Sequence, residues 1–131
     1  NIREQNRNPR KIYCIDNGLK ELVSITKDTG KLYENLVFLK LRRQYRDLFY
    51  FKQKHEIDFC FYNERKQIEL INVCYSLEDH KTRQREIEGL KEAMDAFKLS
   101  QSTLINNDLE GDLLFDGKLI RIKPLWKWLL S

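Results

Sequence analysis

The sequence predicts an α/β domain in which a central mixed sheet is flanked by helices. Three segments with strand composition follow one another between residues 48 and 75, with only short polar turns between them. Longer segments with apolar residues at helical spacing lie before and after this group. Further strand-like runs follow the second helical segment, and this order of elements favours a layered α/β architecture.

Composition limits the broad class of protein. The 131 residues are enough for one domain with a single core, and 41% hydrophobic with 34% charged residues is typical of a globular chain. No apolar run approaches the roughly 18 residues of a membrane span, and no charged-then-apolar leader is present. We therefore expect a cytoplasmic protein without a membrane partner. The net charge of +4 permits contact with nucleic acid but is too small to predict it.

Two chemistries are not expected within these residues. The three cysteines, Cys14, Cys60 and Cys74, are far apart, lack the spacing of zinc ligands and lie in apolar segments, which indicates reduced core thiols. No glycine-rich loop ends in Gly-Lys-Ser or Gly-Lys-Thr, so the chain itself does not hydrolyse ATP by that route.

The first part of the chain is expected to hold a strand at 11–16, a short helix or turn at 18–24 and then a long helix. Asp28 or Thr29 is a candidate cap for this helix, which runs to about Arg46. Its prediction depends on apolar residues that recur at helical spacing: Leu32, Leu36 and Leu39.

The strand group and a second helix follow. The short turns imply an antiparallel meander of three strands, at residues 48–52, 56–62 and 67–75. Ser76 or Asp79 then opens a helix that runs to about Lys98. The buried stripe of this helix is expected to comprise Ile87, Leu90, Met94 and Phe97.

The remaining residues supply the other side of the sheet. Strands are expected at 102–106 and 118–122, followed by a C-terminal segment that is led by Pro124. Helix, three-strand antiparallel meander, helix and strand is the order of elements in the restriction-endonuclease-like core. Trp126 and Trp128 are two residues apart and cannot share a helical face, so one is expected to pack and the other to serve a partner surface.

Polar residues on the second and third strands are the most informative for function. Strict alternation places Glu56 and Asp58 on one face of their strand, and the other face then consists of Ile57, Phe59 and Phe61. A turn over residues 64–66 would put Asp58 opposite Asn72 on the next strand. Nucleases use carboxylates that converge from adjacent strands to hold Mg²⁺, which activates water and screens the phosphodiester.

A structural interpretation competes with the metal site. Glu56 and Asp58 could simply occupy the solvated face of a half-buried strand. Asn72 lies in the middle of an apolar run, where an unpaired amide costs roughly 1–3 kcal/mol. We therefore expect Asn72 to have a partner, for which Asp58 is the natural candidate. A structural hydrogen bond between them is at least as well supported by the pattern as a metal site.

Other charged residues are weaker candidates. Glu34 shares a helical face with the apolar residues Phe38 and Leu41, so it lies either at the edge of that face or toward a polar pocket. Lys81 and Arg85 open the second long helix beside acidic residues. They form either a solvated face with local ion pairs or a site that contacts phosphate.

Several segments taken together resemble one known family. The resemblance covers most of the chain and is carried by KIYCIDNGL (11–19), GKLYENLVFLKLRR (30–43), HEIDFCF (55–61), ELINVCYSL (69–77), KTRQREIEGL (81–90) and IKPLWKWLL (122–130). These motifs resemble the C-terminal domain, often described as a domain of unknown function, of bacterial and archaeal ATP-binding AAA-type ATPases. The resemblance implies that the chain is a C-terminal fragment whose partner is the N-terminal ATPase domain of the parent protein.

The resemblance also implies roles for particular residues. The family is thought to belong to the PD-(D/E)xK nuclease-like superfamily, in which Glu34 would match the helix acid and Asp58 the metal-binding aspartate. Asn72, Val73 and Cys74 stand where the (D/E)-x-K triplet should be. Asn72 retains one neutral oxygen for a metal, but Cys74 cannot supply the positive charge of the lysine. Lys81 or Arg85 could have taken over that role.

Three hypotheses follow. The first is an accessory domain of an AAA-type ATPase with a degenerate nuclease-like site, which binds a partner or nucleic acid and needs no cofactor in isolation. The second is a DNA endonuclease that depends on Mg²⁺ or Mn²⁺ held by Glu34, Asp58 and Asn72. The third is a structural module that forms a homodimer through its C-terminal aromatic residues.

Overall fold

The computed structural model of the chain describes residues 29–52 and 56–131. Two predicted elements, the strand at 11–16 and the short helix or turn at 18–24, lie outside the described residues, as do Cys14 and His55. Within the described ranges no helix is long and apolar enough to cross a membrane.

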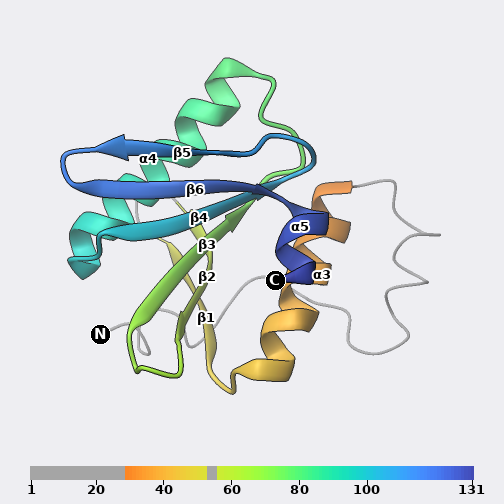
Figure 1. Ribbon diagram of the computed structural model, residues 1–131, viewed down its shortest axis with the longest axis vertical. Coiled ribbons are helices and arrows are strands. Elements are labelled where there is room, and N and C mark those ends of the chain that lie inside the picture. Colours follow the sequence, from red (N-terminus) through yellow and green to blue (C-terminus); the bar gives the residue numbers. More distant parts are fainter. Residues whose placement is uncertain (1–28, 53–55) are drawn as a thin grey trace.

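Nine elements follow one another in the described chain. Helix α3 is followed by three strands, helix α4, three more strands and a short last helix (Figure 1). Their bounds are α3 Thr29–Gln44, β1 Leu48–Lys52, β2 Glu56–Tyr62, β3 Ile68–Val73, α4 His80–Phe97, β4 Gln101–Asn106, β5 Gly111–Phe115, β6 Lys118–Pro124 and α5 Leu125–Leu130.

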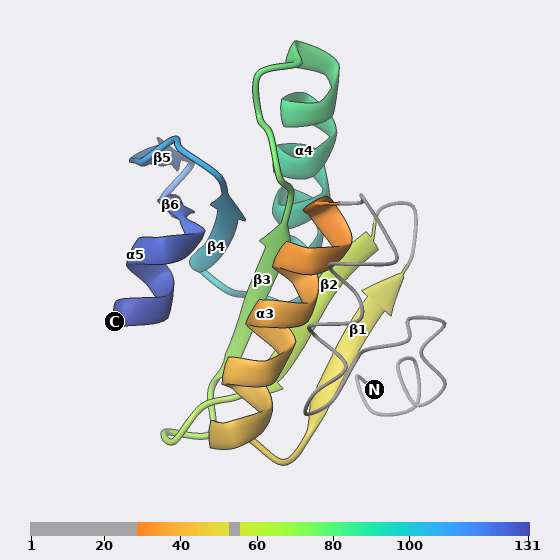
Figure 2. The same ribbon diagram turned by 90° about the vertical axis from the view of Figure 1, so that its right-hand side faces the viewer.

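The six strands form one mixed sheet in the order β1-β2-β3-β4-β6-β5. Strand β2 is antiparallel to both β1 and β3, as the predicted meander requires. Helix α4 connects β3 to β4, and β3, β4 and β6 are mutually parallel. Helix α3 lies across one face of the sheet and α4 across the other (Figure 2). The predicted α/β architecture, with a mixed sheet flanked by helices, is therefore confirmed.

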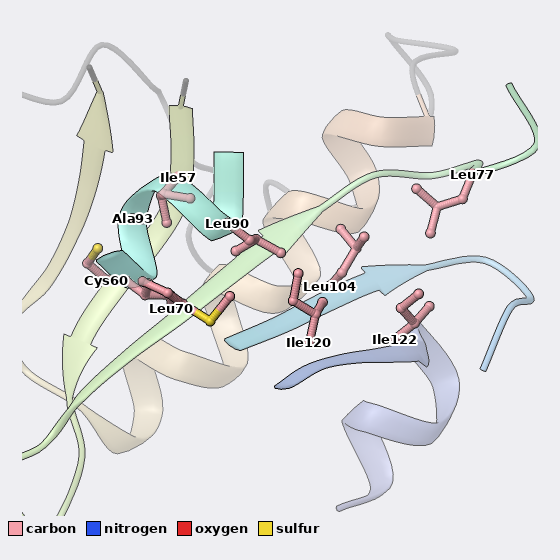
Figure 3. Packing of buried hydrophobic residues seen from close by; sticks show 10 residues of the cluster. Ile57, Cys60, Leu70, Leu77, Leu90, Ala93, Leu104, Ile120 and Ile122 are labelled. Carbon is pink, nitrogen blue, oxygen red and sulfur yellow. The ribbon is translucent and has the colours of Figure 1, made fainter. Parts of the chain in front are cut away.

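Two hydrophobic clusters fill the spaces between these layers. The cluster beneath α4 joins that helix to β2, β3, β4 and β6, and it contains Ile57, Cys60, Leu70, Leu77, Leu90, Ala93, Met94, Leu104, Ile120 and Ile122 (Figure 3). The cluster beneath α3 also receives α5, and it contains Val37, Leu41, Phe59, Phe61, Ile71, Ile105 and Leu125. The stripe predicted for α4 is confirmed, because Leu90 and Met94 are buried and Ile87 and Phe97 pack against the same cluster.

Helix α4 begins and ends where local chemistry dictates. The Asp79 side chain accepts a hydrogen bond from the Thr82 backbone N–H at 2.9 Å, which satisfies one free donor of the first turn. Lys98 closes the helix in the left-handed conformation with φ 55°. Of the two predicted openings, Asp79 is the cap and Ser76 lies in the preceding segment.

The hairpin between β2 and β3 has the predicted three-residue turn over 64–66. The Asn63 N–H donates to Gln67 O at 2.9 Å, and the Asn63 side chain accepts from two backbone N–H groups within the turn. Lys66 takes a positive φ of 60°, which is typical of a three-residue hairpin loop. This turn fixes the register of the two strands.

The prediction that side chains alternate strictly between the two faces of β2 is wrong at Ile57, which does not share a face with Phe59 and Phe61. Phe49 pairs with Cys60 and Phe51 with Ile57, so two residues of β2, Asp58 and Phe59, stand opposite a single residue of β1. This β-bulge reverses the alternation, because the extra residue shifts every later side chain to the other face. Ile57 therefore packs in the α4 cluster with Cys60, whereas Phe59 packs in the α3 cluster.

Strand β5 was not predicted. It is a short edge strand whose Leu114 is 78% exposed, so it lacks the pattern of a half-buried strand. Its turn to β6 consists of Asp116 and Gly117, both at positive φ, which is the geometry that an Asp-Gly pair favours in a two-residue hairpin. That dipeptide was the available signal.

Candidate functional site

Strands β2 and β3 stop pairing through their backbones at the point where Asp58 faces Asn72. The ladder runs from Tyr62 with Ile68 to Phe59 with Ile71, and Asp58 and Asn72 are the next residues in that register. The predicted register is therefore confirmed. Beyond this point side chains take the place of the backbone ladder, because the bulge at Asp58 draws β2 out of regular pairing.

Asn72 uses both ends of its amide to hold the neighbouring strand. Its side-chain oxygen accepts from the Asp58 backbone N–H at 2.9 Å, and its Nδ2 donates to Glu56 O at 3.3 Å. Nδ2 also donates to Glu86 Oε2 at 3.0 Å. Asn72 is only 1% exposed, so these bonds stand in for hydrogen bonds to water. The expectation that Asn72 has a partner is confirmed, although its partner on Asp58 is the backbone and not the carboxylate.

The Asp58 carboxylate makes the reciprocal contact. Its Oδ2 accepts from the Val73 backbone N–H at 2.7 Å, a short charge-assisted hydrogen bond to the strand opposite. Asp58 and Asn72 thus each bond the backbone of the other strand. We refer to Asp58, Asn72 and Glu86 as the Asn72 cluster.

Glu86 is a member of this cluster that sequence reasoning missed. It lies on α4 with a side chain 18% exposed, and Arg85 approaches its other oxygen at 3.9 Å. The Arg85 side chain is 66% exposed, so this ion pair lies in water and is weak. The available signal was spacing, because Glu86 stands four residues before the buried Leu90 and so lies on the inner side of the helix.

Cys74 lies beside the same cluster as a neutral thiol. Burial is the largest cause of the raised pKa of Cys74, the charges of Glu86 and Asp58 add to it, and a backbone hydrogen bond with Ser76 and the charge of Arg85 oppose it. A thiol whose pKa is raised stays protonated near neutral pH, so it is a poor nucleophile and carries no charge. The positive charge that a lysine would bring is absent at this position.

The other predicted site residues are half-buried or exposed, and of these Arg85 has an ion pair with the cluster. Glu34 is half-buried on α3. The ring of the preceding residue, Tyr33, packs edge-on against Tyr75 with centroids 5.0 Å apart, so the turn that carries Glu34 lies near the end of β3. Lys81 is exposed, one helical turn before Arg85. Arg85 therefore reaches the cluster through Glu86, as a weak ion pair.

The described residues do not assemble a carboxylate-rich metal site. Among residues 29–52 and 56–131, no group of three or more histidine, cysteine, aspartate or glutamate side chains could hold a metal ion. Asn72, the third predicted ligand, bonds a backbone N–H with its only oxygen. The proposed metal ligands Glu34, Asp58 and Asn72 thus remain a sequence-based prediction.

The two tryptophans divide as predicted. Trp128 packs against the α3 cluster, where Lys40 Nζ lies 4.6 Å from its ring centroid and donates to its carbonyl oxygen at 2.7 Å. Trp126 is 61% exposed on the other side of α5. Trp128 therefore anchors the last helix, and Trp126 is available on the surface.

Comparison with known proteins gives a family and one relative. Residues 29–128 match the family described as Domain of unknown function (DUF4143). The protein is 40% identical over 132 residues to Uncharacterized protein MJ1544 of Methanocaldococcus jannaschii, a match that covers 92% of this chain and 29% of the relative. The chain thus spans under a third of that relative. No solved structure matches it.

Proposed function

The chain belongs to the DUF4143 family, and from this premise we propose that it is a non-catalytic accessory domain of an AAA-type ATPase. In this proposal its core is related to the restriction-endonuclease-like fold and has lost nuclease chemistry. The motifs at 30–43 and 55–61 support the link to the ATPases. The length of MJ1544 supports the proposal that further domains accompany this one, since the match covers only 29% of that relative.

The bonding of Asn72 carries this proposal. A ligand for Mg²⁺ or Mn²⁺ must direct an oxygen lone pair at the ion, and these cations prefer carboxylates. The one oxygen of Asn72 faces the Asp58 N–H, and the Nδ2 group is held between Glu56 O and Glu86. The side chain is thereby fixed in an orientation that joins two strands to α4.

The charges around Asn72 support the same conclusion. Phosphodiester cleavage needs positive charge where the negative charge develops. Cys74 is a neutral thiol, and the neighbouring cation, Arg85, is mostly exposed and paired with Glu86. Position 74 therefore supplies no positive charge that would steady a phosphate.

A nuclease is the second candidate, because the Asn72 cluster contains the carboxylates of both Asp58 and Glu86. Cleavage of linear and branched DNA in Mn²⁺ by the wild type and by Asp58→Ala tests both candidates. We expect neither protein to cut either substrate. Cleavage by the wild type that is abolished in Asp58→Ala would contradict the accessory-domain proposal and favour the enzyme.

A further inference from the structure

A polar groove lies at the opposite end of β3 from the Asn72 cluster. Strands β3 and β4 pair only from Ile71 with Thr103 to Val73 with Ile105, although β3 begins at Ile68 and β4 at Gln101. The first residues of β4 instead pair with β6 alone. The two strands fan apart toward their starts, as Figures 1 and 2 show.

The groove between them has a volume of about 710 Å³. Sites for small ligands commonly measure about 300–1,000 Å³, so this space is large enough for one. Its walls come from three parts of the chain: the β2–β3 hairpin, the segment from the end of α4 into the start of β4, and Arg121 in the middle of β6. The fold thus brings together segments that are far apart in the sequence, so the groove could not be predicted from the sequence alone.

Positive charge gathers around this groove. Arg65 and Lys66 reach it from the hairpin, Lys98 from the end of α4 and Arg121 from β6, whereas Glu69 is its single carboxylate. By contrast, Lys91, Lys118 and Lys127 elsewhere each pair with a carboxylate.

The four groove cations, Arg65, Lys66, Lys98 and Arg121, have no ion pair and no side-chain hydrogen bond within residues 29–52 and 56–131. Four like charges around one groove repel one another, and an anion bound there would relieve this repulsion. The arrangement therefore suits an anionic ligand.

A buried hydroxyl gives this groove a further donor. Ser102 lines the groove and is 4% exposed, yet its Oγ has no hydrogen-bond partner among the described residues. A buried hydroxyl without a partner is costly, because it has lost its bonds to water. An oxygen-rich anion in the groove would accept this hydrogen bond. The hydroxyl is thus a second observation, independent of the surface charges, that points to a ligand.

We propose that this groove binds the phosphate group of a nucleotide, carried either by a free nucleotide or by a single strand of nucleic acid. A phosphate offers several acceptor oxygens in a compact group, which suits two arginines, two lysines and a hydroxyl. Tyr62 also lines the groove and is 39% exposed, so its ring offers a face on which a base can stack. An acidic peptide could pair its carboxylates with these cations, but it has no base to stack on the Tyr62 ring.

Fluorescence anisotropy of the full chain with a labelled DNA single strand tests this proposal. Arg65→Gln combined with Arg121→Gln should weaken binding by about tenfold for each arginine–phosphate hydrogen bond removed. The double substitution should also reduce the slope of log affinity against log salt concentration by roughly 0.7 for each phosphate contact removed. Ser102→Ala should weaken binding by about fivefold without loss of folded protein. The matched control is Arg43→Gln combined with Arg46→Gln, which removes two exposed cations outside the groove and should leave affinity unchanged.

Competition identifies the source of the phosphate. Displacement by ATP or AMP at least as readily as by unlabelled strand assigns the groove to a free nucleotide, and stronger displacement by the strand assigns it to nucleic acid. No binding, equal losses in the groove and control variants, or equal displacement by a polyglutamate peptide would overturn the proposal. The proposed accessory role fails on a different result, DNA cleavage that depends on Asp58, so the two failures are distinguishable.

Discussion

At the scale of single residues, the amide of Asn72 forms hydrogen bonds that an acid could not. It accepts from Asp58 N–H and donates to two acceptors, Glu56 O and the Glu86 carboxylate. A carboxylate at this position could accept but not donate. The amide at position 72 is therefore part of how these strands are held together.

The substitution Asn72→Asp should destabilise the protein by about 1–3 kcal/mol, because both donated hydrogen bonds are removed and two carboxylates then face each other. The loss of stability should shrink as the pH is lowered, because protonation of either carboxylate removes the repulsion. Urea unfolding at several pH values measures it.

The matched control for this substitution is Asn63→Asp. The Asn63 side chain only accepts hydrogen bonds, from the Arg65 and Gln67 N–H groups, and an aspartate accepts equally well. We expect its stability to stay close to wild type. Equal losses in the two variants would show that the donor role of Asn72 is unimportant.

The buried thiol of Cys60 predicts a dependence on alkaline pH. Burial raises its pKa from 9.0 to about 12 in the folded protein. Between these values the Cys60 thiol has lost its proton in the unfolded chain and keeps it in the folded chain. The contribution of this thiol to stability is therefore fully present below pH 9 and is lost as the pH rises toward 12. The slope should reach about 1.4 kcal/mol per pH unit from this group. Denaturant unfolding of the wild type and of Cys60→Ala at several alkaline pH values measures how the free energy of unfolding changes with pH. The variant should lack the part of this slope that is due to Cys60, and identical slopes in the two proteins would contradict the prediction.

At the scale of elements, the periodic segments were predictable and the irregular ones were not. Helix α4 follows its pattern because it buries one apolar face, and strands β1 and β2 have the predicted bounds because each is an apolar run with a polar segment after it. The bulge at Asp58 and Phe59 was not predictable, because an extra residue in a strand leaves no mark on its composition. Glu86 was missed for a related reason, since its role depends on how α4 lies over β3.

The N-cap of α4 should matter most at neutral pH. Hydrogen bonds from the Thr82 backbone and hydroxyl lower the pKa of Asp79 below 3.8, so its contribution is present above that value and is lost as the pH falls. Asp79→Ala should lower the melting temperature at pH 7 and have less effect near pH 3. Asp79→Ser keeps a capping oxygen and should retain most of the stability. An equal effect of Asp79→Ala at both pH values would argue against the charged cap.

The two tryptophans of α5 provide a matched pair. Trp128→Ala removes a ring that packs on the α3 cluster and under Lys40, and should cost about 1–3 kcal/mol. Trp126→Ala removes an exposed ring and should change stability by less than about 0.5 kcal/mol. Thermal unfolding of both variants measures the difference. Equal costs would mean that α5 is not anchored as described.

At the scale of the whole molecule, the polar cluster and the basic groove occupy opposite ends of β3. The sequence predicted the architecture and the pairing of Asp58 with Asn72, since turn length and strand pattern fix both. It did not predict the groove, which depends on the separation of β3 from β4 and on residues as distant as Arg65 and Arg121. The match over residues 29–128 shows that the chain belongs to the DUF4143 family, whereas the links to an ATPase and to nuclease ancestry stay proposals.

We infer that the Asn72 cluster joins strands and does not hold a catalytic metal. The most direct test is calorimetric titration of Mn²⁺ into the wild-type chain, with Asp58→Ala in parallel. We expect no saturable binding of Mn²⁺ in either protein. Binding of about one ion to the wild type that disappears in Asp58→Ala would contradict it.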